Sequence, residues 1–260
     1  MVNRKNMSFK RRLKDKIHKR YFTEYSSNKR SSYNDYRDFS DFENEVVERV
    51  KPFTMTSPER IVSLIRAVNY IENNNISGSI VECGVWKGGS MMSALLALNK
   101  VNSKDRQLFL YDTYDGMSEP KEVDKSYRDE SAVDAFKTKN DYWDRIKCFS
   151  SLEEVKNNLT KVNYDAQKIH FVKGKVEDTI PNTIPDKICI LRLDTDWYES
   201  TLHELKHLYP LLQPGGILIV DDYGHWQGCR KAVDEYFEEN QIKMYLSRID
   251  YTCRIGIKCL

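Results

Sequence analysis

The sequence contains no long apolar run and carries little net charge, and each of these absences argues against a class of protein. No stretch approaches the ~18 consecutive apolar residues of a membrane-spanning helix. The basic N-terminus lacks the apolar core of a secretory signal. Lysine and arginine number 41 against 39 acidic residues, a net charge of +2, so we expect no nucleic-acid partner. The six cysteines form no CxxC pair, which predicts free thiols in a reducing cytoplasm.

The basic residues are concentrated at one end of the chain. At about 150 residues per domain, 260 residues allow one α/β domain with extensions. Residues 1–30 hold eleven Lys and Arg but only two acidic residues. Apolar residues at every fourth position within 1–22 predict a basic amphipathic helix that contacts the protein body, a partner subunit or an anionic surface. Residues 23–50 show no period, so we expect an irregular arm before a domain spanning residues 51–260.

Strands and helices alternate through that domain. Ser57 followed by Pro58 predicts the start of a helix. The pattern predicts strands at 80–83, 107–111, 169–172, 188–193, 216–220, 241–246 and 254–258, and helices at 90–99, 199–212 and 229–239. The charged segment 116–160 interrupts this rhythm and is interpreted as a lid-like insert. The alternation predicts an α/β fold with a doubly wound, mostly parallel sheet.

Two of the predicted strands end in acidic residues beside a glycine-rich turn. Glu82 and Gly84 begin an ExGxxxGG pattern that leads into a helix at Ser90, where main-chain N–H groups are free to bind a ligand. The GxGxxG pattern of dinucleotide-binding folds is absent, which argues against a nicotinamide cofactor. Asp112 ends the next strand, where an acid accepts both hydroxyls of a ribose in nucleoside-binding folds. A tight turn and a loop-starting aspartate are the alternatives.

Two further acid pairs, Asp194 with Asp196 and Asp221 with Asp222, follow apolar strands. Four carboxylates at one sheet edge repel each other unless a cation lies between them. Carboxylate oxygens favour Mg²⁺, Ca²⁺ or Mn²⁺ over zinc. The sequence therefore predicts a hard-cation site, with exposed loop aspartates as the alternative.

Other interpretations compete with this one. Residues 203–207 match the zinc-protease pattern HExxH, but both histidines lie opposite the apolar face of their helix, so we expect them to face solvent. Asp194 and Asp196 also form the DxD pattern of metal-dependent glycosyltransferases. A third alternative is a binding protein that kept a donor pocket without catalysis.

Several segments together resemble the macrocin O-methyltransferase (TylF/MycF-type) family, which includes the noviose methyltransferases. They are Thr54-Met55, VECGVWKGGS, YDTYDGM, LRLDTDWYEST and GGILIVDDYGHWQGCRKAVDEYF, in this order between about residues 50 and 255. The resemblance implies a class I methyltransferase (Rossmann-like) fold with a seven-stranded sheet. It also implies S-adenosylmethionine as donor and a divalent metal such as Mg²⁺. The acceptor would be a sugar hydroxyl of a glycan or glycosylated natural product.

The same resemblance assigns roles to single residues. Asp194, Asp221 and Asp222 match metal ligands, Asp196 matches the general base, and Met55, Glu82, Gly84, Ser90, Asp112, Val176 and Glu177 match donor-binding positions. The chain departs from common family choices at Asp115, Thr195 and Lys175. Tyr127, Tyr142, Trp143 and Trp226 are candidates for stacking on the acceptor, with ordinary packing as the alternative. We also expect a homo-oligomer in the cytoplasm.

Overall fold

The computed structural model describes residues 36–137 and 148–259. The chain divides into two compact units, Met1–Ser40 and Asp41–Leu260, and every element below belongs to the second. The predicted basic helix at 1–22, and the acceptor candidates Tyr142 and Trp143, lie outside the described residues. No helix in the described part of the chain is long and apolar enough to cross a membrane.

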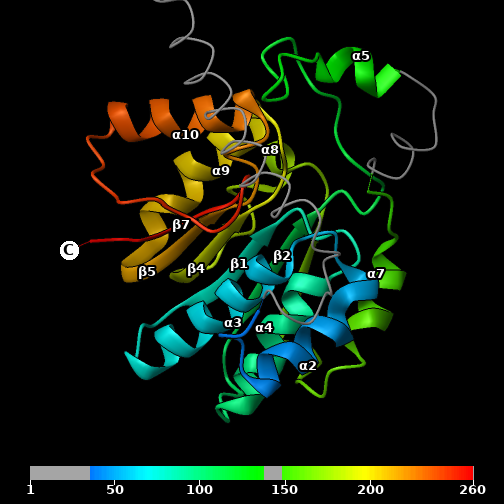
Figure 1. The fold of residues 1–260 in the computed structure, drawn as a ribbon, viewed down its shortest axis with the longest axis vertical. Coiled ribbons are helices and arrows are strands. Elements are labelled where there is room, and N and C mark those ends of the chain that lie inside the picture. Colours follow the sequence, from blue (N-terminus) through cyan, green and yellow to red (C-terminus); the bar gives the residue numbers. More distant parts are fainter. Residues whose placement is uncertain (1–35, 138–147, 260) are drawn as a thin grey trace, which may run out of the picture. The chain divides into compact units, whose positions relative to one another are not determined.

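A seven-stranded sheet in the order β3-β2-β1-β4-β5-β7-β6 forms the centre of this unit (Figure 1). Its strands are β1 (Ser79–Cys83), β2 (Leu108–Asp112), β3 (Ile169–Lys173), β4 (Ile188–Leu193), β5 (Leu212–Val220), β6 (Ser247–Arg248) and β7 (Arg254–Ile257). The first five strands pair in parallel, whereas β7 pairs antiparallel with both β5 and β6. The predicted doubly wound, mostly parallel sheet is confirmed.

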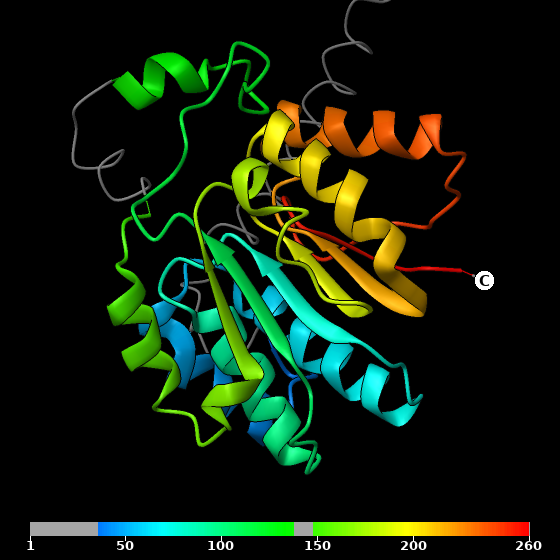
Figure 2. The ribbon, with the colours of Figure 1, turned by 180° about the vertical axis from the view of Figure 1, so that it is seen from behind.

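Helices cover both faces of the sheet, because the central strands are apolar on both sides (Figure 2). Ile80 packs into one apolar layer and its neighbour Val81 into the other. The first layer includes α2 (Asp41–Val50), α3 (Pro58–Asn73), α4 (Gly89–Lys100) and α7 (Leu152–Leu159). The second includes α8 (Val176–Thr179), α9 (Tyr198–Leu208) and α10 (Gln227–Glu239). The remaining helical turns are η1 (Lys51–Phe53), α5 (Ala132–Lys137), η2 (Ala166–Lys168) and η3 (Tyr209–Leu211).

Three elements differ from the predictions. Residues 41–50 form α2 rather than an irregular arm, because Val46 and Val50 lie one turn apart and are both buried in the first layer. The predicted strand at 241–246 is wrong: β6 spans only Ser247–Arg248, and the apolar residues before it pack against the second layer as irregular chain. The helix expected to reach residue 212 ends at Leu208, where Pro210 leads into η3.

The start of α3 agrees with its sequence signature. Ser57 accepts a hydrogen bond from the main-chain N–H of Arg60, and Pro58 occupies the first helical position. This places the preceding segment, residues 54–56, against the sheet edge where the strands of the parallel sheet end. The acids at the ends of β2, β4 and β5, which are Asp112, Asp194, Asp221 and Asp222, line a cavity at the same edge.

Candidate active site

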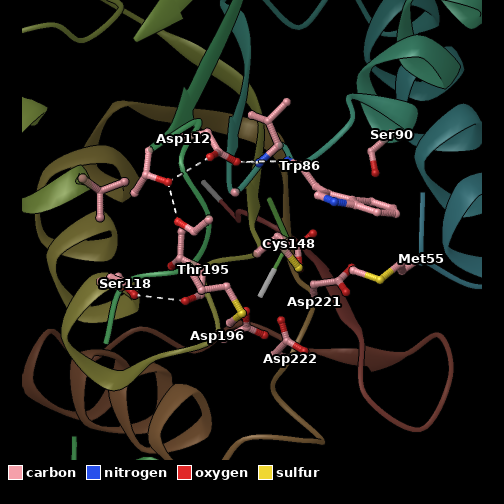
Figure 3. Close-up of a pocket in the computed structure, with 18 of the residues that line it drawn as sticks. Met55, Trp86, Ser90, Asp112, Ser118, Cys148, Thr195, Asp196, Asp221 and Asp222 are labelled. Carbon is pink, nitrogen blue, oxygen red and sulfur yellow. Dashed lines mark hydrogen bonds between the residues drawn. The ribbon is translucent and has the colours of Figure 1, made fainter. Parts of the chain in front are cut away.

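A cavity of about 230 Å³ opens at the carboxyl ends of the parallel strands (Figure 3). Every site residue predicted from the sequence lines it except Glu82: Met55, Gly84, Ser90, Asp112, Val176, Glu177, Asp194, Asp196, Asp221 and Asp222. They come from the segment before α3, from the turn after β1, from the end of β2, from the loops after β4 and β5, and from the starts of α4 and α8. The cavity therefore joins the expected donor-binding and metal-binding residues in one place.

The turn after β1 requires glycine for two reasons. Gly84 adopts a left-handed φ of +85°, and a Cβ at this position would lie 2.0 Å from the carbonyl oxygen of Asp194. The turn can therefore approach the end of β4 only without a side chain. At this turn the main-chain N–H of Gly84 donates to the carbonyl of Tyr111, near the end of β2, at 2.8 Å.

Asp112 holds this glycine turn in place. Its Oδ2 accepts from the N–H groups of Val85 at 2.6 Å and Trp86 at 2.9 Å, while Oδ1 accepts from Tyr114 N at 2.7 Å. A carboxylate oxygen has more than one lone pair, so these bonds leave acceptor capacity toward the cavity. The residue thus has a structural task that the sequence interpretation of a ribose ligand did not include.

The far walls of the cavity come from other elements. Ser90 lies in the first turn of α4, and Val176 with Glu177 opens α8 just after β3. Met55 lines the cavity while 54% of its surface remains exposed, so it stands at the rim. Figure 3 shows Met55, Trp86 and Ser90 on one side of the cavity, with Asp196 and Asp222 next to each other at its base.

Three carboxylates at the base of the cavity lie close enough together to bind one metal ion. Oxygens of Asp194, Asp221 and Asp222 lie within 4.8 Å of one another. Asp222 Oδ2 is buried without a hydrogen-bond partner, so nothing on the protein compensates the burial of this oxygen. Burial, together with the neighbouring acids, raises the pKa of both Asp194 and Asp222 well above the usual range. An oxygen-only donor set with this unpaired charge fits a hard divalent cation such as Mg²⁺.

A buried arginine that the sequence interpretation missed lies behind these carboxylates. Arg192, on β4, is 2% exposed and donates to Glu82 Oε1 at 2.9 Å, Asp194 Oδ2 at 2.6 Å and Asp221 Oδ1 at 2.5 Å. Glu82 is bound into this ion-pair network through Oε1 and is not among the residues that line the cavity. Burial raises the pKa of Glu82 to about 7, although Arg192 lowers it.

Asp196 lies beside the acidic group of Asp194, Asp221 and Asp222. It has a left-handed φ of +69°, which brings its side chain beside Asp222 in the turn after β4. The indole N–H of Trp226 donates to its Oδ1 at 3.0 Å and orients the carboxylate. Burial raises the pKa of Asp196 to about 7, while hydrogen bonds to Asp222 and Trp226 lower it. Such a value suits a general base near neutral pH.

The HExxH pattern does not form a metal site. His203 is partly buried and its Nε2 lies 2.9 Å from the carbonyl oxygen of Ile180, so the expected solvent-facing position is wrong. Glu204 points elsewhere: it is fully buried and accepts from Thr195 Oγ1 at 2.8 Å. The rings of His203 and His207 contact each other at a tilt, with 4.5 Å between their centroids and 49° between their planes.

The profile of the macrocin-O-methyltransferase (TylF) family matches residues 3–255. The chain belongs to this family. The match starts well before residue 50, so the basic N-terminal segment falls within the family's sequence pattern. Together with the observed fold, membership makes this protein a class I O-methyltransferase.

Individual relatives agree with the macrocin-O-methyltransferase assignment. Mycinamicin III 3″-O-methyltransferase of Micromonospora griseorubida is 31% identical over 197 residues, which cover 76% of this chain and 75% of the relative. Demethyldecarbamoylnovobiocin O-methyltransferase of Streptomyces niveus is 32% identical over 197 residues, covering 76% and 72%. The solved structure of the O-methyltransferase NovP superposes with a TM-score of 0.69 at 30% identity, covering 80% of this chain and 83% of NovP.

In this member of the macrocin-O-methyltransferase family, aromatic side chains stand beside the acidic group. Trp226 lines the cavity and packs edge-on against Trp197 at 5.0 Å. Tyr127, half exposed, contacts the rings of His225 and Tyr251 at 5.6 and 6.1 Å but does not line the cavity itself. The first part of the 116–160 insert is anchored here, because Trp197 Nε1 donates to the Ser118 carbonyl at 2.9 Å.

Proposed function

We propose that this protein transfers the methyl group of S-adenosylmethionine to a sugar hydroxyl in a Mg²⁺-dependent reaction. The observation that carries the proposal is the meeting of two half-sites in one cavity. The glycine turn with Asp112 forms one half, and the group Asp194, Asp221 and Asp222 with Asp196 forms the other. The relatives whose names include mycinamicin and demethyldecarbamoylnovobiocin support a glycosylated natural product as the acceptor class.

The donor half positions the methyl group, which S-adenosylmethionine supplies when bound. The turn from Gly84 to Trp86 offers close backbone approach at the end of β1, and Asp112 offers oxygens to the ribose. Val176 and Glu177 provide the wall for the adenine, and Met55 covers the donor from the rim. Enclosure by these elements fixes the direction of the methyl group toward the acidic half, and positioning of this kind is a large part of catalysis.

The acceptor half supplies the proton acceptor. Asp194, Asp221 and Asp222 would hold a divalent cation, which polarises neighbouring sugar hydroxyls and lowers their pKa. Asp196, oriented by Trp226, takes the proton from the hydroxyl that is methylated. Trp226 also presents an apolar face to the acceptor at the side of the cavity.

Binding measurements separate this function from the alternatives. By isothermal titration calorimetry, we expect S-adenosylmethionine to bind and a uridine-diphosphate sugar not to bind. Mg²⁺ affinity should be unchanged in the double variant His203→Ala, His207→Ala, since neither ring contacts the acidic group. Preferential binding of the nucleotide sugar would favour the DxD glycosyltransferase, and zinc binding lost in the double variant would favour the peptidase. Donor binding without turnover on any acceptor would indicate a binding protein.

Asp112 provides the prediction for the donor half. Asp112→Asn should weaken S-adenosylmethionine binding by about 1–3 kcal/mol, because one charged acceptor for the turn and the ribose becomes a neutral amide. Asp115→Asn is the matched control, since Asp115 is exposed on the same loop and does not line the cavity. Calorimetry on both variants checks this. Equal donor affinity in the wild-type protein and a folded Asp112→Asn variant would remove Asp112 from the donor site.

The proposal also covers the cellular location, the domain organisation and the oligomeric state of the enzyme. All six cysteines lie in the described residues and form no disulfide with one another, which supports a cytoplasmic location. Because α2 packs within the domain, the proposed basic extension that contacts a partner subunit or an anionic surface is limited to residues 1–40, residues 41–260 form the methyltransferase domain, and the chain is proposed to form a homo-oligomer. Sedimentation of the full chain and of a chain lacking residues 1–30 at several salt concentrations tests the assembly.

A further inference from the structure

Asp221 has both of its carboxylate oxygens bound by arginines. Oδ1 accepts from Arg192 at 2.5 Å, and Oδ2 forms an ion pair with Nη1 of Arg60. The Arg192 side chain is 3% exposed and is fixed by two further acids, so it cannot leave. Arg60 comes from the first turn of α3 and is 14% exposed at the cavity wall. Oδ2 is therefore the Asp221 oxygen that a cation in the cavity can reach.

Arg60 has a second carboxylate within reach that is not part of the acidic group. Its Nε donates to Asp250 Oδ2 at 2.7 Å. Asp250 is held firmly, because its Oδ1 accepts from the N–H groups of Thr252 at 2.9 Å and Cys253 at 2.8 Å. The guanidinium thus bridges one carboxylate of the acidic group and one outside it, and it can keep the second partner when it gives up the first.

We propose that Arg60 competes with the divalent cation for Asp221. When the cation binds, Arg60 releases Asp221 and pairs with Asp250 alone. This inference rests on the proposed metal-dependent function. A divalent cation and the guanidinium repel each other when both lie against Oδ2, so a cation that uses this oxygen drives the guanidinium away from it. Asp250 lowers the cost of displacement, because Arg60 stays paired instead of becoming a desolvated free charge. Arg60 therefore sets the cation affinity of the site without being a ligand.

Calorimetric titration of Mg²⁺ into chelator-treated, desalted protein without donor or acceptor tests this. Arg60→Gln should tighten Mg²⁺ binding about tenfold, the size expected when one competing charged hydrogen bond is removed. Asp250→Asn, which keeps an Oδ1 acceptor for Thr252 and Cys253, should weaken Mg²⁺ binding. The double variant should bind like Arg60→Gln, because Asp250 acts only through Arg60.

The controls distinguish displacement from a general charge effect. Arg254→Gln removes a charge from the β6–β7 hairpin, which also holds Asp250. Nη1 of Arg254 donates only to main-chain carbonyls, so this variant should leave Mg²⁺ affinity within about twofold. If Arg60→Gln does not fold by circular dichroism, Arg60→Met replaces it: methionine keeps an apolar side chain of similar length but removes the competing charge, so Mg²⁺ should again bind more tightly.

Each result decides between the two proposals. Unchanged or weaker Mg²⁺ binding in folded Arg60 variants, with normal binding by the wild type, overturns the competition and leaves the metal-dependent function standing. The same holds if Asp250→Asn weakens binding equally with and without Arg60. Absence of Mg²⁺ binding in both the wild type and the Arg60 variants overturns the metal site and the competition together.

Discussion

Asp196→Asn is expected to lower the methyl-transfer turnover about 10²–10⁴-fold, which is the usual contribution of a positioned general base. The amide cannot accept the proton of the acceptor hydroxyl, but it keeps the size of the side chain and the bond from the Trp226 indole. Donor and Mg²⁺ affinities should stay within about twofold, because Asp196 is not one of the three grouped ligands. Steady-state methyl transfer and calorimetry on one preparation measure both quantities.

The pH profile gives this prediction a second readout. The base must be ionised, so the wild-type rate should fall as pH falls through the pKa of Asp196, which is about 7. A bound cation should move this acidic limb of the pH–rate profile to lower pH. Asp196→Asn should lose the limb, and its residual rate should rise with pH as hydroxide replaces the base. Asp194→Ala should instead lose Mg²⁺ affinity and partly recover at high Mg²⁺. Near-normal turnover in Asp196→Asn would transfer the role to His225, whose pKa is lowered by burial.

Arg192→Met should destabilise the fold by about 3–5 kcal/mol, the typical effect of removing one partner from a buried ion network. Methionine has similar length but leaves Glu82, Asp194 and Asp221 buried without their common cation. A loss of this size is a large share of the ~5–15 kcal/mol stability of a typical domain. Urea unfolding followed by circular dichroism measures the change.

Two further variants make the Arg192 result specific. Arg230→Met removes an exposed arginine on α10 and should change stability by no more than about 0.5 kcal/mol. Adding Glu82→Gln to Arg192→Met should restore part of the lost stability, because it removes one uncompensated charge at the same place. An Arg192→Met protein as stable as the Arg230 control would show that the network does not stabilise the fold.

The sequence predicted the parallel core of the fold well, because each central strand is a short apolar run followed by a turn. It failed where the pattern was short or depended on tertiary packing. The α2 helix shows only two buried valines one turn apart, and the residues before β6 are apolar because they pack on the second layer. Periodicity alone cannot distinguish such packing from a strand.

The site was predictable where chemistry follows strand ends, and it was not where partners come from distant segments. Asp194, Asp221 and Asp222 follow apolar strands, so their meeting could be inferred. Arg192 offered a signal that was not used: a charge within an apolar strand must find buried partners. Arg60 offered none, because its pairing with Asp221 joins residues 161 positions apart. The pairing of Glu82 with Arg192 likewise joins residues 110 positions apart, so the sequence did not indicate it.

The most direct test of the central claim is methyl transfer with and without chelation. The enzyme is incubated with methyl-labelled S-adenosylmethionine and either mycinamicin III or demethyldecarbamoylnovobiocin, the compounds in the names of two relatives. Mass spectrometry then locates the label. We predict one added methyl on a sugar hydroxyl, lost in EDTA and restored by Mg²⁺ but not by zinc. Transfer that continues undiminished in EDTA, or label on a group other than a sugar hydroxyl, would contradict the account.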